Sequence, residues 1–212
     1  MNQLAMPVTK RNLLLALIGA SLLGLTACGD AGSPQGSAAE ASMPPLQGAD
    51  IGGEFELVDK NGKSVRWSDF DGKYRTVYFG FTYCPDVCPT DVQRAMRGLK
   101  QLAQADPGKA AKIQPIFISV DPERDTPEAV GQFTAAFSDD LVGLTGTPEQ
   151  VKAVADAFRV YYERGEEQDG GGYLVNHSAI TYLFGPKGEP LATLPTDQGP
   201  EAVAAELAKW VN

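Results

Sequence analysis

The sequence predicts an α/β domain built on one mixed β-sheet that is covered by helices on both faces. Segments with strand composition alternate with segments of helical periodicity along most of the chain. Two strand segments, Tyr74–Phe81 and Ile113–Val120, are continuous runs rich in β-branched and aromatic side chains, as in strands buried on both faces. A helical segment lies between them, so we expect these two middle strands to be parallel. A chain of 212 residues suits one such domain.

The domain is expected to open with a β-hairpin. Phe55–Val58 and Ser64–Trp67 have strand composition, and they flank Asn61-Gly62, which is a strong signal for a tight turn. After the strand Tyr74–Phe81, apolar residues recur at helical spacing over Thr90–Ala105. The strand Ile113–Val120 follows this helix.

Two further helices carry the same start signal. Each begins with a threonine as N-cap, a proline at the first helical position and an early acid, in Thr126-Pro127-Glu128 and Thr147-Pro148-Glu149. We expect these helices to end near Phe137 and Phe158. The remaining elements are a second hairpin and a closing helix, over Ala179–Phe184, Leu191–Leu194 and Glu201–Val211.

The first 27 residues predict a secretory signal peptide. Lys10 and Arg11 precede an apolar stretch that is too short, and too often interrupted by small residues, for a permanent membrane span. Leu25-Thr26-Ala27-Cys28 resembles the bacterial lipobox, which implies that Cys28 is acylated and becomes the mature N-terminus. The alternative is an ordinary signal peptide followed by an unrelated cysteine. The lipobox predicts a bacterial cell-membrane lipoprotein that faces the periplasm or extracytoplasmic space.

The residues after Cys28 predict a tether. Residues 29–48 are rich in Gly, Ser, Ala and Pro and have almost no large apolar side chains to bury. The expected organisation is therefore a signal peptide at 1–27, an acylated linker at 28–48 and a folded domain at 49–212. Without the signal, 16 basic side chains face 27 acidic ones, a formal net charge of −11. Such a surface argues against nucleic acid or anionic lipid headgroups as partners.

Cys84 and Cys88 lie where a strand meets a helix, in Cys84-Pro85-Asp86-Val87-Cys88-Pro89. The positive end of a helix lowers thiol pKa, which favours a nucleophile or a metal ligand. Pro85 and Pro89 disfavour helix for the residues before them, so we expect a stiff loop. A structural disulfide is the alternative, but so small a closed loop would stabilise the fold little.

His177 is the only histidine of the chain, at the entrance to a predicted strand after Gly170-Gly171-Gly172. A lone histidine is usually a surface or capping residue. Together with Cys84 and Cys88, it would complete a set of three metal ligands. Two thiolates and one imidazole without an obvious fourth ligand suit Cu(I) better than structural zinc, which normally takes four protein ligands. We therefore predict a copper site that holds Cu(I), with Cu(II) as a second state.

At these residues the chain resembles the Sco/SenC family of copper-binding assembly factors for cytochrome c oxidase. Three separated motifs carry the resemblance, which runs from about Asp50 to the C-terminus: Phe79–Thr90 with its C-x-x-x-C-P core, Ser119–Pro127, and Asn176-His177-Ser178. The resemblance implies a thioredoxin-like fold with copper held by Cys84, Cys88 and His177. It also implies copper delivery to the CuA centre of oxidase subunit II, or reduction of its cysteines. The implied partners are subunit II and other periplasmic copper carriers or thiol reductants.

The third motif contains two aspartates whose roles the sequence leaves open. Asp121 follows a central strand, and its carboxylate could orient the site or a partner from outside the ligand set. Equally, Asp121 and Asp125 could serve only to structure the turn before the next helix. Asp86, between the cysteines, is expected to be a solvated turn residue.

Two classes of function therefore compete. A metallochaperone, which is not an enzyme, would bind copper and pass it on. A thiol-disulfide reductase would use Cys84 and Cys88 as its redox pair, with Cys84 in the attack and Cys88 resolving the mixed disulfide. The spacing C-x-x-x-C and the lack of a preceding Trp depart from ordinary thioredoxins and lower the case for a general reductase. A membrane-tethered copper or redox sensor is the third alternative.

Overall fold

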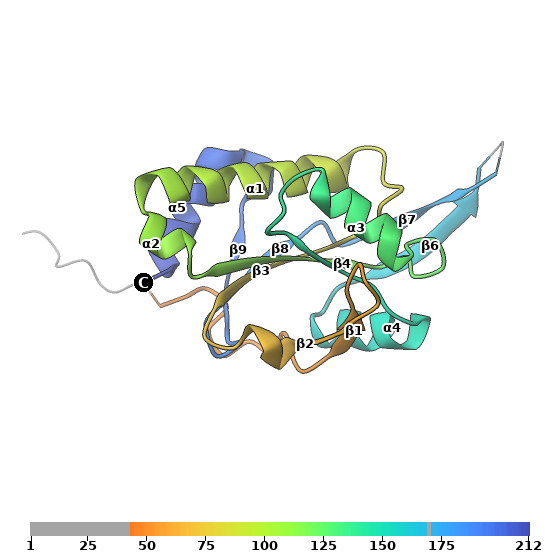
Figure 1. Cartoon of the computed structure of the whole chain (residues 1–212), viewed down its shortest axis with the longest axis horizontal. Coiled ribbons are helices and arrows are strands. Elements are labelled where there is room, and N and C mark those ends of the chain that lie inside the picture. The colour runs from red at the N-terminus through yellow and green to blue at the C-terminus, as the bar shows by residue number, and fades with distance from the viewer. Residues whose placement is uncertain (1–42, 169–170) are drawn as a thin grey trace, which may run out of the picture. The chain divides into compact units, whose positions relative to one another are not determined.

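A mixed five-stranded sheet forms the centre of the domain, in the order β5-β4-β3-β8-β9 (Figure 1). The computed structural model describes residues 43–168 and 171–212. The strands of this sheet are β3 (Tyr74–Gly80), β4 (Ile113–Ser119), β5 (Val142–Leu144), β8 (Thr181–Phe184) and β9 (Pro190–Leu194). β3 and β5 run parallel to β4, whereas β8 is antiparallel to both β3 and β9. The predicted mixed sheet with parallel middle strands is confirmed.

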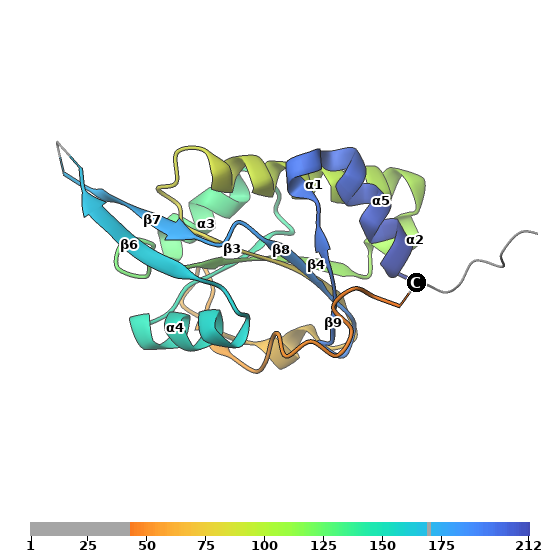
Figure 2. The same cartoon turned by 180° about the vertical axis from the view of Figure 1, so that it is seen from behind.

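Helices cover both faces of this sheet (Figures 1 and 2). One face carries α1 (Val87–Ala105), α3 (Pro127–Ala135) and α5 (Pro200–Trp210), with the short α2 (Pro107–Ala110) following α1. The other face carries α4 (Pro148–Ala157) and the expected hairpin of β1 (Glu56–Val58) and β2 (Ser64–Arg66). Two 3-10 turns, Trp67–Phe70 and Thr196–Gln198, complete the layers.

The alternation of side chains along β3 divides the core between the two faces. Tyr78 stacks on Phe117 of β4 with ring centroids 6.3 Å apart, and Phe117 in turn packs on Phe133 of α3. Phe79, the next residue, points the other way and packs on Phe158 at the end of α4, with centroids 5.4 Å apart. Because β3 is buried along its whole length, the loop that follows it starts from a rigid base.

The predicted helix starts at Thr126 and Thr147 are confirmed. The hydroxyl of Thr126 accepts a hydrogen bond from the backbone N–H of Ala129, and that of Thr147 accepts one from Gln150. The backbone N–H of Thr147 in turn donates to the side-chain oxygen of Gln150, which completes a capping box.

The structure differs from the prediction at one helix start and one hairpin. α1 begins at Val87 rather than Thr90, because Pro89 occupies the first turn, where no backbone N–H donor is needed. A hairpin of β6 (Tyr162–Glu167) and β7 (Tyr173–His177) was not predicted, and it extends beyond the end of the sheet (Figure 2). Its strands are largely solvent-exposed and charged, so they lack the apolar alternation that identifies a strand in sequence. The short β5 and α2 were not predicted either.

The predicted signal peptide, the lipid site at Cys28 and Gly170 lie outside the described residues. The predicted linker is described only from Met43, and there the backbone N–H of Leu46 donates to the carbonyl of Leu191 at 3.0 Å. Contacts of the domain therefore extend N-terminally beyond the expected boundary at residue 49. Within residues 43–168 and 171–212, no helix has the length and apolar character needed to cross a membrane.

Candidate metal centre

The two cysteines flank the N-terminal end of α1, just beyond the carboxyl end of β3. Cys84 lies in the loop of residues 81–86, which we call the cysteine loop, and Cys88 is the second residue of the helix. The expected stiff loop thus holds only Cys84, and the first helical turn fixes Cys88. The backbone N–H of Cys88 donates to the Cys84 sulfur at 3.3 Å, which orients this sulfur toward the helix. Both thiols are free and buried.

His177 completes the cluster from the far side. It is the last residue of β7, rather than the residue before a strand as predicted, and its Nε2 lies 3.1 Å from the Cys88 sulfur. The ligand atoms of Cys84, Cys88 and His177 all lie within 4.8 Å of one another. The structure therefore brings together the three residues that the sequence selected as metal ligands.

The orientation of the His177 ring suits a metal ligand. Its Nδ1 lies 3.2 Å from the carbonyl oxygen of Ser178, and since a carbonyl only accepts, Nδ1 carries the proton. Nε2 therefore presents its lone pair to the sulfurs. Burial lowers the pKa of His177 below its usual value, which keeps the ring neutral. The rings of Phe81 and Tyr78 meet the imidazole edge-on and confine it.

The thiol pKa of Cys88 contradicts one prediction. The helix N-terminus was expected to lower it, but burial raises the pKa of Cys88 well above its ordinary value. The side chain is fully buried, so desolvation of the thiolate outweighs the helix dipole. A metal ion that binds Cys88 must therefore displace a proton from it.

Gly80, the last residue of β3, allows the Cys88 sulfur to lie against the strand. A Cβ atom at this position would lie 3.1 Å from the Cys88 sulfur and 2.8 Å from the Tyr78 ring. This glycine was not predicted as part of the site. The signal that could have identified it is a glycine inside the apolar strand run Tyr74–Phe81, because such a glycine often marks a close approach.

We expect Gly80→Ala to destabilise the domain by about 1–3 kcal/mol, because the added methyl group overpacks a rigid part of the core. It should also displace the Cys88 sulfur and weaken metal binding. Denaturant unfolding and metal titration of the reduced chain measure both effects. Gly108→Ala, on the short helix α2, is the matched control, since its Cβ would meet only one carboxylate oxygen of Asp106, at 3.3 Å. Equal stability of the two variants would contradict the packing argument.

The aspartates of the third motif lie outside the ligand cluster. Asp121 is buried, pairs with Arg124 at 2.6 Å and accepts a hydrogen bond from the Tyr173 hydroxyl at 2.8 Å. Asp125 accepts from both the N–H and the hydroxyl of Thr82, at 2.9 and 2.7 Å. Asp86 is exposed, as expected.

Another buried carboxylate near the centre was not predicted. Asp91 lies one helical turn after Cys88, is 6% exposed and accepts a hydrogen bond of 3.4 Å from the Tyr78 hydroxyl. Its position three residues after Cys88 places it on the same face of α1, which is the sequence signal for it.

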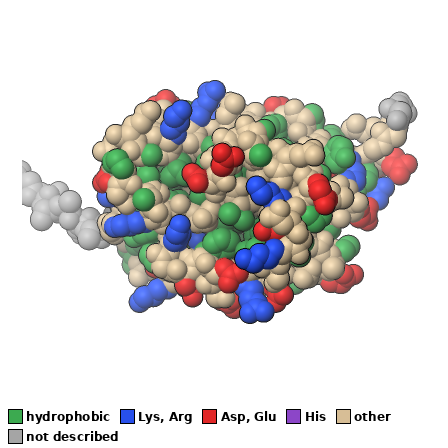
Figure 3. Space-filling model, viewed as in Figure 1, with side chains coloured by type: hydrophobic (Ala, Val, Ile, Leu, Met, Phe, Trp, Pro, Cys, Tyr) green, Lys and Arg blue, Asp and Glu red, His purple; other side chains and the backbone are tan. Residues whose placement is uncertain are grey.

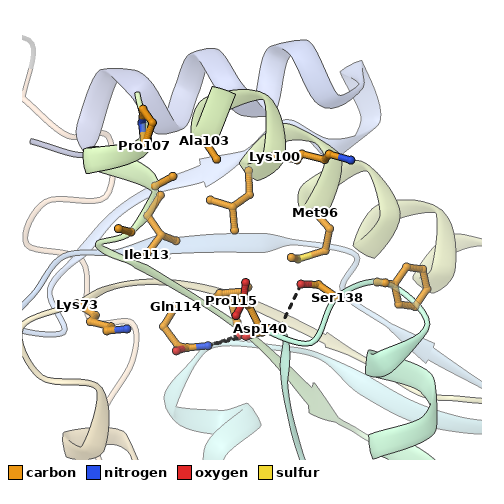
Figure 4. A pocket seen from close by; sticks show the side chains of 14 residues that line it. Lys73, Met96, Lys100, Ala103, Pro107, Ile113, Gln114, Pro115, Ser138 and Asp140 are labelled. Carbon is orange, nitrogen blue, oxygen red and sulfur yellow. Dashed lines mark hydrogen bonds between the residues drawn. The ribbon is translucent and has the colours of Figure 1, made fainter. Parts of the chain in front are cut away.

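The hollow in Figure 4 is separate from this centre. It lies between α1, α2 and the start of β4, and Met96, Leu99 and Ile113 contribute apolar side chains to it. Ile113 is the first residue of β4, whereas the cysteine loop follows the carboxyl end of the neighbouring parallel strand. The hollow and the ligand cluster therefore lie at opposite ends of the sheet.

The face drawn in Figure 3 shows acidic and basic side chains interspersed, without a continuous basic surface.

A family model described as SCO1/SenC matches residues 43–212, which is the whole of the domain described above. The chain belongs to the SCO1/SenC family. This family membership agrees with the motifs of the cysteine loop and of His177, and the thioredoxin-like fold expected from the resemblance is confirmed.

Curated relatives and a solved structure match the same region. The chain is 39% identical over 178 residues to the mitochondrial protein SCO2 homolog of Bos taurus, covering 84% of this chain and 66% of that protein. It is 40% identical over 158 residues to the mitochondrial protein SCO1 homolog of Homo sapiens, covering 74% and 52%. The chain thus spans only about half to two thirds of these relatives. ScoI of Bradyrhizobium japonicum, solved with copper bound, is 38% identical with a TM-score of 0.68, covering 76% of this chain and 99% of that one.

Proposed function

We propose that this SCO1/SenC protein binds one copper ion through Cys84, Cys88 and His177 and delivers it to the CuA centre of cytochrome c oxidase subunit II. The observation that carries the proposal is the convergence of the three ligand atoms within 4.8 Å. A relative of the same family, ScoI of Bradyrhizobium japonicum, was solved with copper bound. Delivery to subunit II follows from the family resemblance.

The donor set fits copper. Two thiols and one imidazole are soft ligands of the kind that Cu(I) prefers. Among the described residues, the cluster contains no fourth His, Cys, Asp or Glu, whereas a structural zinc site normally takes four protein ligands. A set of three leaves room for an incoming ligand, which transfer of the ion requires.

The exposure of the ligands suggests the order of release. Cys88 is fully buried and Cys84 is 9% exposed, while His177 is half-buried at the end of a hairpin. A partner's thiolate or imidazole therefore replaces His177 first and the buried Cys88 last. Gly171 and Gly172, both with positive φ, form part of the turn of that hairpin and give it conformational freedom.

We place the domain at the outer surface of a bacterial cell membrane, anchored by lipid on Cys28. The lipobox resemblance and the apolar N-terminal stretch support this placement. In the periplasm or extracytoplasmic space, other copper carriers would load the site. Thiol reductants would keep Cys84 and Cys88 reduced, because a disulfide between them cannot bind copper.

A dedicated thiol-disulfide reductase is the second candidate, favoured by the hydrogen bond that the Cys84 sulfur accepts from the Cys88 amide. This bond fixes the position of the Cys84 sulfur, whose thiolate would attack a disulfide of subunit II and form a mixed disulfide. Cys88 would then displace the partner, leaving a Cys84–Cys88 disulfide and two reduced thiols on subunit II. The raised pKa of Cys88 suits this second step better than the first attack.

One comparison separates these candidates. We expect the reduced full chain to bind one equivalent of Cu(I), and to reduce a disulfide-containing subunit II peptide only slowly. The reason is that the site has three converged metal ligands but one thiol that is protonated and buried. Metal counting and thiol release measure the two activities. Rapid peptide reduction that persists in His177→Ala would favour the reductase, and copper binding without transfer to subunit II would favour a sensor.

A further inference from the structure

One turn contacts both the cysteine loop, which carries Cys84, and the hairpin that carries His177. Residues 121–125, which follow β4, contact the cysteine loop through Asp125 and Arg124. The Asp125 carboxylate accepts two hydrogen bonds from Thr82, and the Arg124 guanidinium lies 4.9 Å from the ring centroid of Tyr83. Tyr83 is the residue before Cys84, so this turn holds the cysteine loop immediately next to a ligand.

The same turn also contacts the hairpin that ends in His177. The Arg124 guanidinium lies 3.6 Å from the ring centroid of Tyr173, the first residue of β7. The Tyr173 hydroxyl donates to Asp121 at 2.8 Å, and Asp121 pairs with Arg124 at 2.6 Å. Tyr173 and His177 belong to the same short strand, so a shift of one moves the other.

The Arg124 side chain contacts an aromatic ring on the cysteine loop and another on the hairpin. Its planar guanidinium stacks on aromatic faces, and the buried Asp121 carboxylate holds it in place. Its side chain is 21% exposed, so water screens these contacts little.

Arg164 provides an internal comparison. It lies 3.9 Å from the Tyr173 ring centroid and pairs with Glu123 and Glu167, which are both exposed. Its ion pairs and its aromatic contact do not involve the cysteine loop. The two arginines therefore share the contact with the hairpin but differ in the contact with the cysteine loop.

We propose that Arg124 is a positioning residue for His177: by stacking on Tyr83 and Tyr173, it couples the cysteine loop to the strand that presents the imidazole. Its loss leaves both segments folded but lets His177 move relative to the sulfurs. The proposal rests on the proposed copper function. It assigns to this turn the control of how easily His177 leaves the ion during transfer.

The test uses the untagged, reduced full chain, loaded with one equivalent of Cu(I), as wild type, Arg124→Ala and Arg164→Ala. Competition with a chelating probe measures copper affinity. The imidazole ¹H–¹⁵N spectrum reports whether the ring is bound, and His177 is the only histidine, so its signals need no assignment. We expect Arg124→Ala to lower the affinity about tenfold, the lower end for residues outside the ligand set. Its His177 signals should move toward those of the copper-free chain, while Arg164→Ala stays close to wild type.

Arg124→Lys guards against misfolding of the alanine variant. Lysine keeps a positive charge beside Asp121 but loses the planar contact, so the same direction of change is expected. If both Arg124 variants match the wild type, or if Arg164→Ala loses as much affinity as Arg124→Ala, the inference is overturned. Failure of the wild type to take up copper would instead overturn the proposed function.

Discussion

His177→Ala should lower the copper affinity of the reduced chain more than about 100-fold, which is the upper end for residues outside a ligand set. The variant removes one of three ligands. In the wild type, the Nε2 atom of His177 lies 3.1 Å from the Cys88 sulfur. No other imidazole can replace it, because the chain has a single histidine. Competition titration with a Cu(I) chelator measures the change.

The fold should survive this substitution. His177 is only half-buried at the end of a hairpin, so its loss removes two edge-on ring contacts and little core volume. Asn176→Ala is the matched control, because Asn176 is the exposed neighbour on the same strand. Copper affinity of His177→Ala equal to that of this control would remove His177 from the ligand set.

Asp125→Ala should destabilise the domain by about 3–5 kcal/mol. Its buried carboxylate accepts three hydrogen bonds, from the N–H and hydroxyl of Thr82 and from the Ser119 hydroxyl at 2.6 Å. Each donor left without a partner costs about 1–3 kcal/mol where it is buried. Thermal or denaturant unfolding measures the loss. Asp86→Ala, at an exposed aspartate of the cysteine loop, should stay within about 0.5 kcal/mol of wild type.

The destabilisation by Asp125→Ala should also depend on pH. Burial raises the pKa of Asp125 above its value of 3.8 in the unfolded chain, so the folded protein holds this proton more tightly. The wild type therefore loses stability as the pH rises between the two pKa values. The alanine variant has no carboxyl group at this position, so it lacks this loss. The difference between wild type and variant should be larger at about pH 4 than at about pH 7. The opposite trend would show that the three hydrogen bonds outweigh burial.

Much of the fold could be predicted because local signals agreed with the tertiary structure. The continuous apolar runs of β3 and β4 reflect burial on both faces, and the N-caps at Thr126 and Thr147 act locally. The β6–β7 hairpin could not be predicted in this way. Its two strands pair only with each other and expose most of their side chains, so no apolar period marks them.

The ligands could be predicted, but their surroundings could not. Cysteine and histidine are rare in this chain, and their chemistry limits the roles that Cys84, Cys88 and His177 can have. The order of the three motifs then indicated the family. The contacts of Arg124 with Tyr83 and Tyr173 join residues up to 49 positions apart, and nothing local indicates them. The raised pKa of Cys88 likewise depends on burial of its side chain in the folded domain. The position of Cys88 near a helix N-terminus does not reveal this burial.

Copper transfer is the most direct test of the proposed function. The chain loaded with one equivalent of Cu(I) is mixed with the reduced, copper-free domain of subunit II, the two are separated, and copper is counted on each. We expect copper to move to subunit II from the wild type, whereas Cys88→Ser, unable to hold the ion, should deliver none. Copper that stays on the loaded chain, or equal delivery by Cys88→Ser, would contradict the proposed function.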